Sequence, residues 1–429
     1  MLQRVAILKP LRHRPFRFLF FGELVSDLGD WLDFLALIAL IVYRWELGAP
    51  ELAALAVVMV LPHLIVAPLA GVWVDRLPRK RLMIGADLGR AVVVLGLVWA
   101  PELISLLILV FLKVALSAVF GPARQAAIRE TVPDEDLLPA NGLSQLSLQA
   151  SKVLGPMIGG VIVSLAGPRA AFVVDSVTFL VSAAFLSQLA ILARPQPSEE
   201  EEEEDEDEEE VRGFWRELRA GLVVIFHRRA LAVAVVGMAA AMFMIFAFDG
   251  LGPLALRELG VGEALLGLAI GSVGFGTAVG AIVVSQWAGR VHPFVLMGGG
   301  KLIAGLLVAL VGMAAVVQAN AAGLTWIPVW LAIGLSGAAI FVPYGYILQR
   351  ETPPEMMGRV FASANGLQTI FQLAAPVIGA ALAEIIGIGW VLAIFGLGLA
   401  VVGLAVLLLR PPVGEGNRDV ETSVETSAA

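Results

Sequence analysis

Four carboxylates recur on one stretch of an otherwise apolar chain. Glu23, Asp27, Asp30 and Asp33 follow one another at spacings of four, three and three residues. On an α-helix these positions fall within an arc of about 120°, so one face of the helix is acidic. Carboxylates placed in this way can take up and release protons, and they can pair with basic side chains.

Two lysines lie in the middle of other apolar stretches, Lys113 within 103–123 and Lys152 within 142–166. Because opposite charges at similar depth in a membrane tend to pair, we expect a cluster of Asp30 or Asp33 with Lys113 or Lys152. Two interpretations stay open. The cluster is either a proton-coupling or substrate-contacting group, or a static ion-pair network that fixes helix packing.

The composition predicts the elements that must position these charges. The chain has 429 residues, of which 59% are hydrophobic and only 15% charged, and its mean hydropathy is +0.87. Apolar stretches of about 20 residues recur, which is the length a helix needs to cross a hydrocarbon core of roughly 30 Å. We therefore predict an all-α integral membrane protein with twelve transmembrane helices.

Lysine and arginine residues gather in alternate connections between these stretches. Basic residues in short loops remain on the cytoplasmic side, so both termini are expected to be cytoplasmic in a multi-pass protein of the cell inner (plasma) membrane. Enzymatic classes have no support. The chain has no cysteine, its four histidines are scattered, and MGGGKL at 297–302 lacks the pattern of a phosphate loop. We expect no catalytic residue, cofactor, metal or nucleic-acid partner, and an ion gradient as the driving force.

An unbroken run of twelve acids, Glu199–Glu210, divides the apolar stretches six and six. Such a run repels itself and buries no apolar area, which favours a disordered spacer over a partner-binding segment. The basic segment after it, 211–229, has the pattern of a helix lying on the inner leaflet. The predicted organisation is a cytoplasmic segment at 1–16, a six-helix bundle at 17–193, a cytoplasmic linker at 194–229, a second bundle at 230–410 and a disordered cytoplasmic tail at 411–429.

The two halves repeat a sequence pattern. Arg-Glu-Thr, a proline, Ala-Asn-Gly-Leu and a proline followed by Ile-Gly occur in this order within Arg129–Gly160 and again within Arg350–Ala380. An internal repeat of this kind indicates two related six-helix halves.

The connection between the second and third stretches, AGVWVDRLPRK, resembles the loop signature of the major facilitator superfamily. Its matching residues are Gly71, Asp75, Arg76, Arg79 and Lys80, with Pro78 where the family usually has glycine. The resemblance implies a cytoplasmic latch in which Asp75 binds the start of the eleventh helix, near 358–361. A plain topology anchor is the alternative. In the third stretch, Asp87 and Arg90 are three residues apart and can pair instead of facing lipid.

The fifth stretch is similar to a motif of proton-coupled drug antiporters, through Ser151, Gly155, Pro156, Gly159 and Gly160. The first stretch and GPARQAAIRE resemble bacterial macrolide and siderophore exporters, so the likeness covers almost the whole chain. It implies two pseudo-symmetric six-helix bundles, and proton-coupled export of small amphiphilic drugs or secondary metabolites by alternating access. Protons, the substrate and membrane lipids are the expected partners of a monomer. A carrier of lysophospholipids or other lipids, and a non-transporting scaffold or sensor, are the alternatives.

Overall fold

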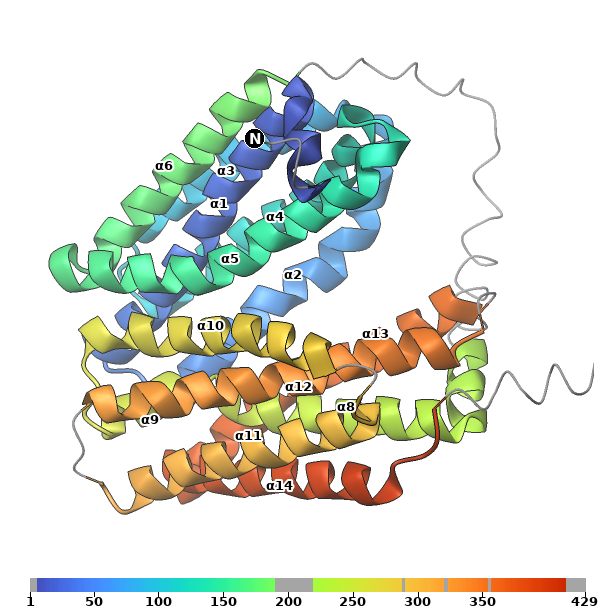
Figure 1. The fold of residues 1–429 in the computed structure, drawn as a ribbon. Helices are drawn as coiled ribbons and strands as arrows, with labels where there is room; N and C mark the ends of the chain where they lie inside the picture. The colour runs from blue at the N-terminus through green and yellow to red at the C-terminus, as the bar shows by residue number, and fades with distance from the viewer. Residues whose placement is uncertain (1–5, 190–218, 288–289, 320–322, 354–355, 414–429) are drawn as a thin grey trace, which may run out of the picture. The chain divides into compact units, whose positions relative to one another are not determined.

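The regular elements of the described residues are helices (Figure 1). This computed structural model describes residues 6–189, 219–287, 290–319, 323–353 and 356–413, without the side chains of 6–7, 67–69, 71–76 and 264. The acidic run Glu199–Glu210 and most of the predicted linker lie outside the described residues.

Six long helices follow one another in the N-terminal half, after a short 3₁₀-helix η2 (Ala6–Arg12). A one-turn π-helix, η3 (Leu40–Arg44), continues the first of them. The six long helices are α1 (Arg14–Ala39), α2 (Ala49–Arg76), α3 (Arg79–Leu97), α4 (Leu103–Thr131), α5 (Asp134–Ala166) and α6 (Pro168–Ser187).

The C-terminal half contains a second set of long helices, together with the short α9 (Gly252–Glu258) and η4 (Gly323–Trp326). The long ones are α8 (Arg229–Asp249), α10 (Glu263–Trp287), α11 (Pro293–Val316), α12 (Ile327–Glu351), α13 (Met357–Ile386) and α14 (Ile388–Leu409).

Ten helices within the described residues are long and apolar enough to cross a membrane. The long helices α1 and α3 are not among them, because each carries a series of charged side chains along its length. These two helices supply the acidic face and the Asp87–Arg90 pair, so the charges that set them apart are those of the candidate site.

The chain forms two compact units. The first consists of 1–197, 256–274 and 321–327, and the second of the remaining residues. In the first unit α1 packs against α5 and α6, α3 packs against α4 and α6, and α2 packs against α4. In the second unit α11 packs against α14, and α8 packs against α13 and α14.

Glycines at seven-residue intervals explain the close pairing of α11 with α14. Gly298, Gly305 and Gly312 on α11 face Gly403, Gly396 and Gly389 on α14. A Cβ at Gly298 would lie 2.8 Å from the carbonyl oxygen of Gly403, and one at Gly312 would lie 2.6 Å from that of Gly389. Small residues let helix backbones approach in a membrane, where lipid tails compete for apolar contacts.

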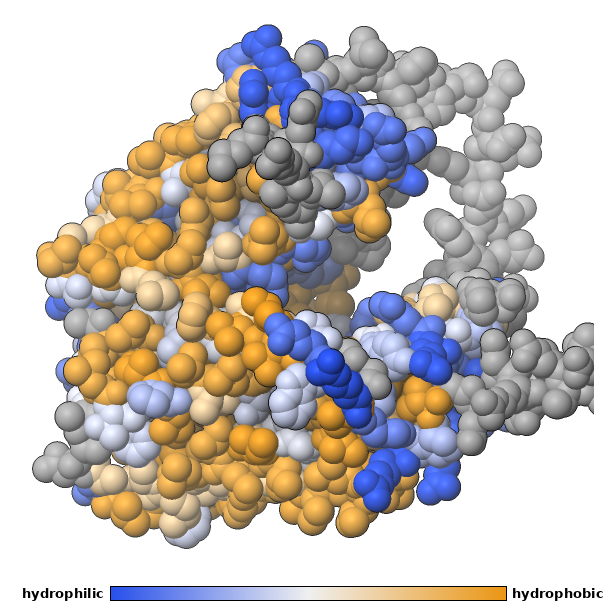
Figure 2. Space-filling view, in the orientation of Figure 1, coloured by the Kyte–Doolittle hydropathy of each residue, from blue (hydrophilic) through white to orange (hydrophobic). Residues whose placement is uncertain are grey.

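The opposite face of α14 is apolar and exposed, as expected for a surface in contact with lipid. Figure 2 shows such apolar surface over the visible parts of α14 and α6. On α14 the exposed side chains recur every three or four residues, at Trp390, Ile394, Leu397, Val401, Leu404 and Leu408.

The segment before α1 is tied to the start of α5 through the buried carboxylate of Asp136. Its oxygens lie 2.9 Å from Lys9 Nζ, 3.0 Å from an Arg12 guanidinium nitrogen and 2.8 Å from His13 Nε2. Hydrogen bonds to Asp136 and Glu135 raise the pKa of Lys9 above its ordinary value of 10.5. Lys9 therefore stays charged over the physiological range and holds η2 against α5.

Candidate functional site: a buried charge cluster on α1, α3, α4 and α6

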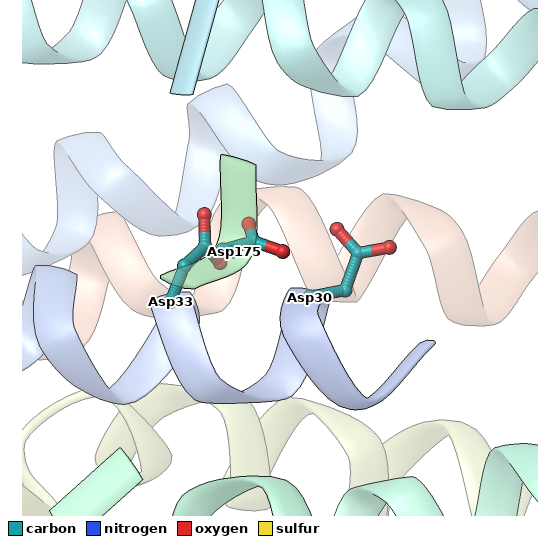
Figure 3. Close-up of side chains that lie close together, drawn as sticks. All are labelled: Asp30, Asp33 and Asp175. Atoms are coloured by element: carbon teal, nitrogen blue, oxygen red, sulfur yellow. The ribbon is translucent and has the colours of Figure 1, made fainter. Parts of the chain in front are cut away.

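Lys113 of α4 is the centre of the candidate site. Its Nζ lies 2.7 Å from Asp30 Oδ1, 2.7 Å from Asp33 Oδ2 and 3.6 Å from Asp175 Oδ2. Asp30 and Asp33 are one turn apart on α1, and Asp175 reaches them from α6 (Figure 3). The side chains of Asp33 and Asp175 are buried, whereas that of Asp30 is 31% exposed. One ammonium group thus joins three helices, and Asp30 connects the cluster to the accessible surface.

Asp175 completes the cluster and was not among the residues singled out from the sequence. The signal was present, because an acid inside the apolar run AFVVDSVTFL is expected to be functional or paired. Its Oδ1 accepts a hydrogen bond of 2.9 Å from Thr178 Oγ1. Sequence spacing links only residues on the same helix, so it did not connect Asp175 to Asp33.

Gly29 allows α6 to bring Asp175 to α1. A Cβ at position 29 would clash with Asp175 Oδ1 and with Thr178 Oγ1. Any larger residue would push α6 outward and separate Asp175 from Lys113, so this glycine sets the geometry of the cluster.

Arg90 is the second cation of the cluster. Its guanidinium pairs with Asp87 one turn earlier on α3, lies 3.6 Å from Asp30 Oδ2 and donates a hydrogen bond of 3.4 Å to Ser117 Oγ. The guanidinium carbon also lies 4.4 Å from the ring centroids of both Phe120 and Phe179, which is the geometry of a cation–π contact on two sides. Asp87 and Arg90, expected as part of the cytoplasmic latch region, therefore belong to the same network as Asp30.

The network contains four carboxylates, Asp30, Asp33, Asp87 and Asp175, and two cations, Lys113 and Arg90. The nearest carboxylate oxygens of Asp30, Asp33 and Asp175 lie within 4.8 Å of one another. Carboxylates this close repel unless cations or protons lie between them. The Lys113 ammonium occupies the position that a metal ion would need, so the arrangement fits proton binding better than metal binding.

Glu23 belongs to a separate buried contact further along α1. It pairs with Arg124 of α4, and its Oε2 accepts a hydrogen bond of 3.0 Å from Ser144 Oγ of α5. The acidic face of α1 is therefore divided, since Glu23 is fully partnered apart from the cluster around Lys113.

Lys152 does not reach Asp30 or Asp33. Its Nζ lies 5.7 Å from the ring centroid of Trp31 on α1, and it interacts electrostatically with Asp27. Asp27 and Lys152 are each half-buried, and within the described residues no ion pair joins them directly. The structure thus brings Lys113 to the two aspartates and leaves Asp27 and Lys152 as a second charged pair of side chains.

Gly155 and Gly159 of the helix 5 motif lie at the contact between α5 and α1, whereas a Cβ at Gly160 would lie 2.9 Å from the Cα of Gly267 on α10. A Cβ at Gly155 would clash with that of Trp31, and one at Gly159 would lie 3.1 Å from the carbonyl oxygen of Leu32. Ser151, Gly155, Pro156, Gly159 and Gly160 are all buried. In this structure the motif holds α5 close to the acidic helix.

The side chains at positions 71–76, which include Asp75 and Arg76, lie outside the described set, so the predicted latch at Asp75 remains a prediction. Two neighbouring residues of the signature are described. Arg79 pairs with Glu130 of α4, and Lys80 Nζ donates hydrogen bonds of 2.6 and 2.8 Å to the carbonyl oxygens of Ser187, the last residue of α6, and of Leu189 just after it. Both basic residues tie the start of α3 to its neighbours within the first unit.

Long helices with exposed apolar faces that enclose ionisable side chains define a class of protein, the polytopic membrane proteins, in which those side chains mark a candidate functional site. The model of the Major Facilitator Superfamily matches residues 19–376, and the chain belongs to this family. It is a multi-pass membrane protein and a secondary transporter, not an enzyme. The expected all-helical fold of this superfamily is confirmed.

Similar proteins include several transporters. The chain is 24% identical to the uncharacterized MFS-type transporter YfiS of Bacillus subtilis (strain 168), over 95% of each chain. It is 28% identical to the putative bacilysin exporter BacE of Bacillus amyloliquefaciens, over 63% of this chain and 66% of the relative. It is 26% identical to the enterobactin exporter EntS of Salmonella paratyphi A, over 83% of this chain and 82% of the relative.

A crystal structure of a mutant of the peptide transporter POT superposes on this chain with a TM-score of 0.71. The match covers 93% of this chain and 95% of that one at 13% sequence identity, which establishes a common fold.

Proposed function

We propose that the protein exports small amphiphilic molecules in exchange for protons, and that the Lys113 cluster is its proton site. The observation that carries this proposal is the single ammonium group of Lys113 between the carboxylates of Asp30, Asp33 and Asp175. The relatives that are named as exporters of bacilysin and enterobactin support export as the direction.

The cluster has the properties that coupling requires. Four carboxylates face two cations, so binding of protons relieves repulsion that Lys113 and Arg90 cannot relieve alone. Asp30 is partly exposed and connects the buried Asp33 and Asp175 to the accessible surface. A rearrangement of α1 against α4 or α6 changes the distances to Lys113, and with them the affinity for protons. Coupling then follows if protons and substrate favour different conformations.

We also propose roles for the other residues that the sequence singled out. Asp75 acts as a cytoplasmic latch, the helix 5 motif supports α1, and the protein works as a monomer surrounded by membrane lipids. The substrate occupies the half-buried surface beside the cluster, where Asp27, Asp30, Trp31 and Lys152 are partly exposed.

Proton release tests the proposal directly. Proteoliposomes with a ΔpH are challenged with lipophilic cations, macrolides, siderophores and lysophospholipids, and lumenal pH is followed with a dye. We expect substrate-dependent proton movement with the wild type that is lost in Asp30→Asn and retained in the matched control Asp134→Asn, an exposed acid at the start of α5. Transport without proton movement would contradict coupling. Activity with lysophospholipids alone would establish a lipid carrier instead, and no transport of any candidate would favour a scaffold or sensor.

A further inference from the structure

Asp27 and Lys152 are the charged side chains of the α1–α5 contact that the proton cluster does not use. Asp27 Oδ2 is buried and has no hydrogen-bond partner among the described residues. Lys152 lies over Trp31 and is joined to no carboxylate by an ion pair within the same part of the chain. A charged group with an unpaired buried atom is costly in a membrane protein and marks a functional position.

The two residues lie at the same depth of the α1–α5 contact. Further towards the start of these helices Glu23 meets Ser144, and further towards their ends Gly155 lies against Trp31 and the carbonyl oxygen of Leu28. Asp27 therefore lies level with the turn of α5 that contains Ser147, Ser151 and Lys152. The hydroxyls of Ser147 and Ser151 are buried as well, and no described residue forms a hydrogen bond with them.

We propose that Asp27 of α1 and this turn of α5 together form the substrate subsite and that the subsite selects zwitterions. Asp27 binds an ammonium group and Lys152 binds a carboxylate of the same molecule. This inference rests on the proposed function and names the substrate class of that site. Trp31, which makes an edge-to-face contact with Phe34 at 5.6 Å, supplies an aromatic surface for the apolar part.

The charges of the subsite argue for one molecule that carries both signs. A simple cation would pair with Asp27 but would leave Lys152 unpaired and would be repelled by it. A simple anion would have the converse difficulty. Because the two side chains lie at the same depth and no ion pair joins them within the described residues, a ligand placed between them pairs both. A site built in this way discriminates against analogues that lack either group, since each omission leaves a half-buried charge unpaired.

A set of four probes with the same body tests the inference on the complete chain in lipid nanodiscs. The dipeptide Phe-Leu is a zwitterion, its amide is a cation, its N-acetyl derivative is an anion, and the N-acetyl amide is neutral. Calorimetric titration should show that the zwitterion binds about tenfold to a hundredfold more tightly than each of the other three. If the zwitterion binds no more tightly than the neutral analogue, the inference is wrong, and this result needs no variant.

Variants assign the two charges. In Asp27→Asn the zwitterion should bind no more tightly than the N-acetyl anion, and in Lys152→Gln no more tightly than the cationic amide. The exposed Glu102→Gln, at the start of α4, should behave as the wild type. If both variants lose affinity for all four probes to the same extent, Asp27 and Lys152 have a structural role and the assignment is wrong. Binding is measured without a ΔpH, so a wild type that moves protons with cationic drugs but shows no preference for zwitterions contradicts this inference and leaves proton coupling intact.

Discussion

Lys113 Nζ and Asp33 Oδ2 lie 2.7 Å apart and join α4 to α1 at two buried side chains. A lysine in this position stabilises the fold only while its carboxylate partners are ionised, because each partner compensates the desolvation of the other. The same contact therefore contributes to stability and, in the function proposed above, to proton exchange.

Replacing Lys113 alone should destabilise the first unit. Lys113→Met leaves Asp33 and Asp175 buried without their cation, at a cost of about 3–5 kcal/mol. The double variant Lys113→Met/Asp33→Asn should recover part of this loss, because one of the uncompensated carboxylates is gone. Chemical unfolding in detergent measures both. The matched control is Arg169→Met, an exposed cation at the start of α6. Equal stability of Lys113→Met and this control would contradict the compensation.

Asp175, although far from Asp33 in sequence, should be needed for coupling. Asp175→Asn removes one of the four carboxylates and should lower substrate-dependent proton release about tenfold or more, while substrate affinity changes less than about twofold. A ΔpH-sensitive dye in proteoliposomes and binding to protein in nanodiscs provide the two measurements. Proton release equal to that of the wild type would exclude Asp175 from the proton site, whereas a parallel loss of binding would assign it to the substrate instead.

Gly29 should tolerate no side chain. Gly29→Ala places a methyl group against Asp175 and Thr178 and should cost about 1–3 kcal/mol through overpacking. Gly121→Ala on α4 is the matched control, since a Cβ there meets no atom within 4 Å. It should be neutral or stabilising by up to about 1 kcal/mol. Thermal unfolding of both variants in one detergent makes the comparison, and similar melting temperatures would contradict the close approach of α1 and α6.

The contact between η2 and Asp136 should protect the segment before α1. Asp136→Asn weakens the pairing with Lys9 and Arg12, so amide hydrogen exchange in Ala6–Arg12 should accelerate, whereas exposed Asp134→Asn should leave it unchanged. In the wild type the pKa of Lys9 is raised, so its contribution is complete below pH 10.5 and is lost as the pH rises through the higher folded-state pKa. Unaltered exchange in Asp136→Asn would show that other contacts hold the segment.

Much of the fold follows from hydropathy and charge, but helix ends do not. The fourth and fifth apolar stretches were expected at 103–123 and 142–166, whereas α4 continues to Thr131 and α5 begins at Asp134. These added turns are polar on one face, and an apolar window cannot detect them. The added turns of α5 are favoured because the acids Asp134, Glu135 and Asp136 suit a helix start.

Only the part of the site that lies on a single helix could be predicted from the sequence. The spacing of Asp30 and Asp33 placed them on one face, and matched depth suggested a lysine partner. Matched depth did not distinguish Lys113 from Lys152, because that choice depends on how α4 and α5 pack around α1. The position of Asp175 depends on the close approach of α6 to α1 at Gly29. A single glycine in a sequence with 45 of them does not indicate such a contact.

Arg90 is held between Phe120 and Phe179 and pairs with Asp87. With its four carboxylates ionised and its two cations charged, the cluster carries a net charge of −2, and each proton that binds to a carboxylate makes this charge one unit more positive. If the cluster is the proton site proposed above, a change of access between the two sides of the membrane moves a different charge in the loaded and unloaded forms. The membrane potential acts on that difference with about 2.3 kcal/mol per elementary charge for each 100 mV. The electrical gradient, and not the pH gradient alone, then becomes a driving force for this carrier.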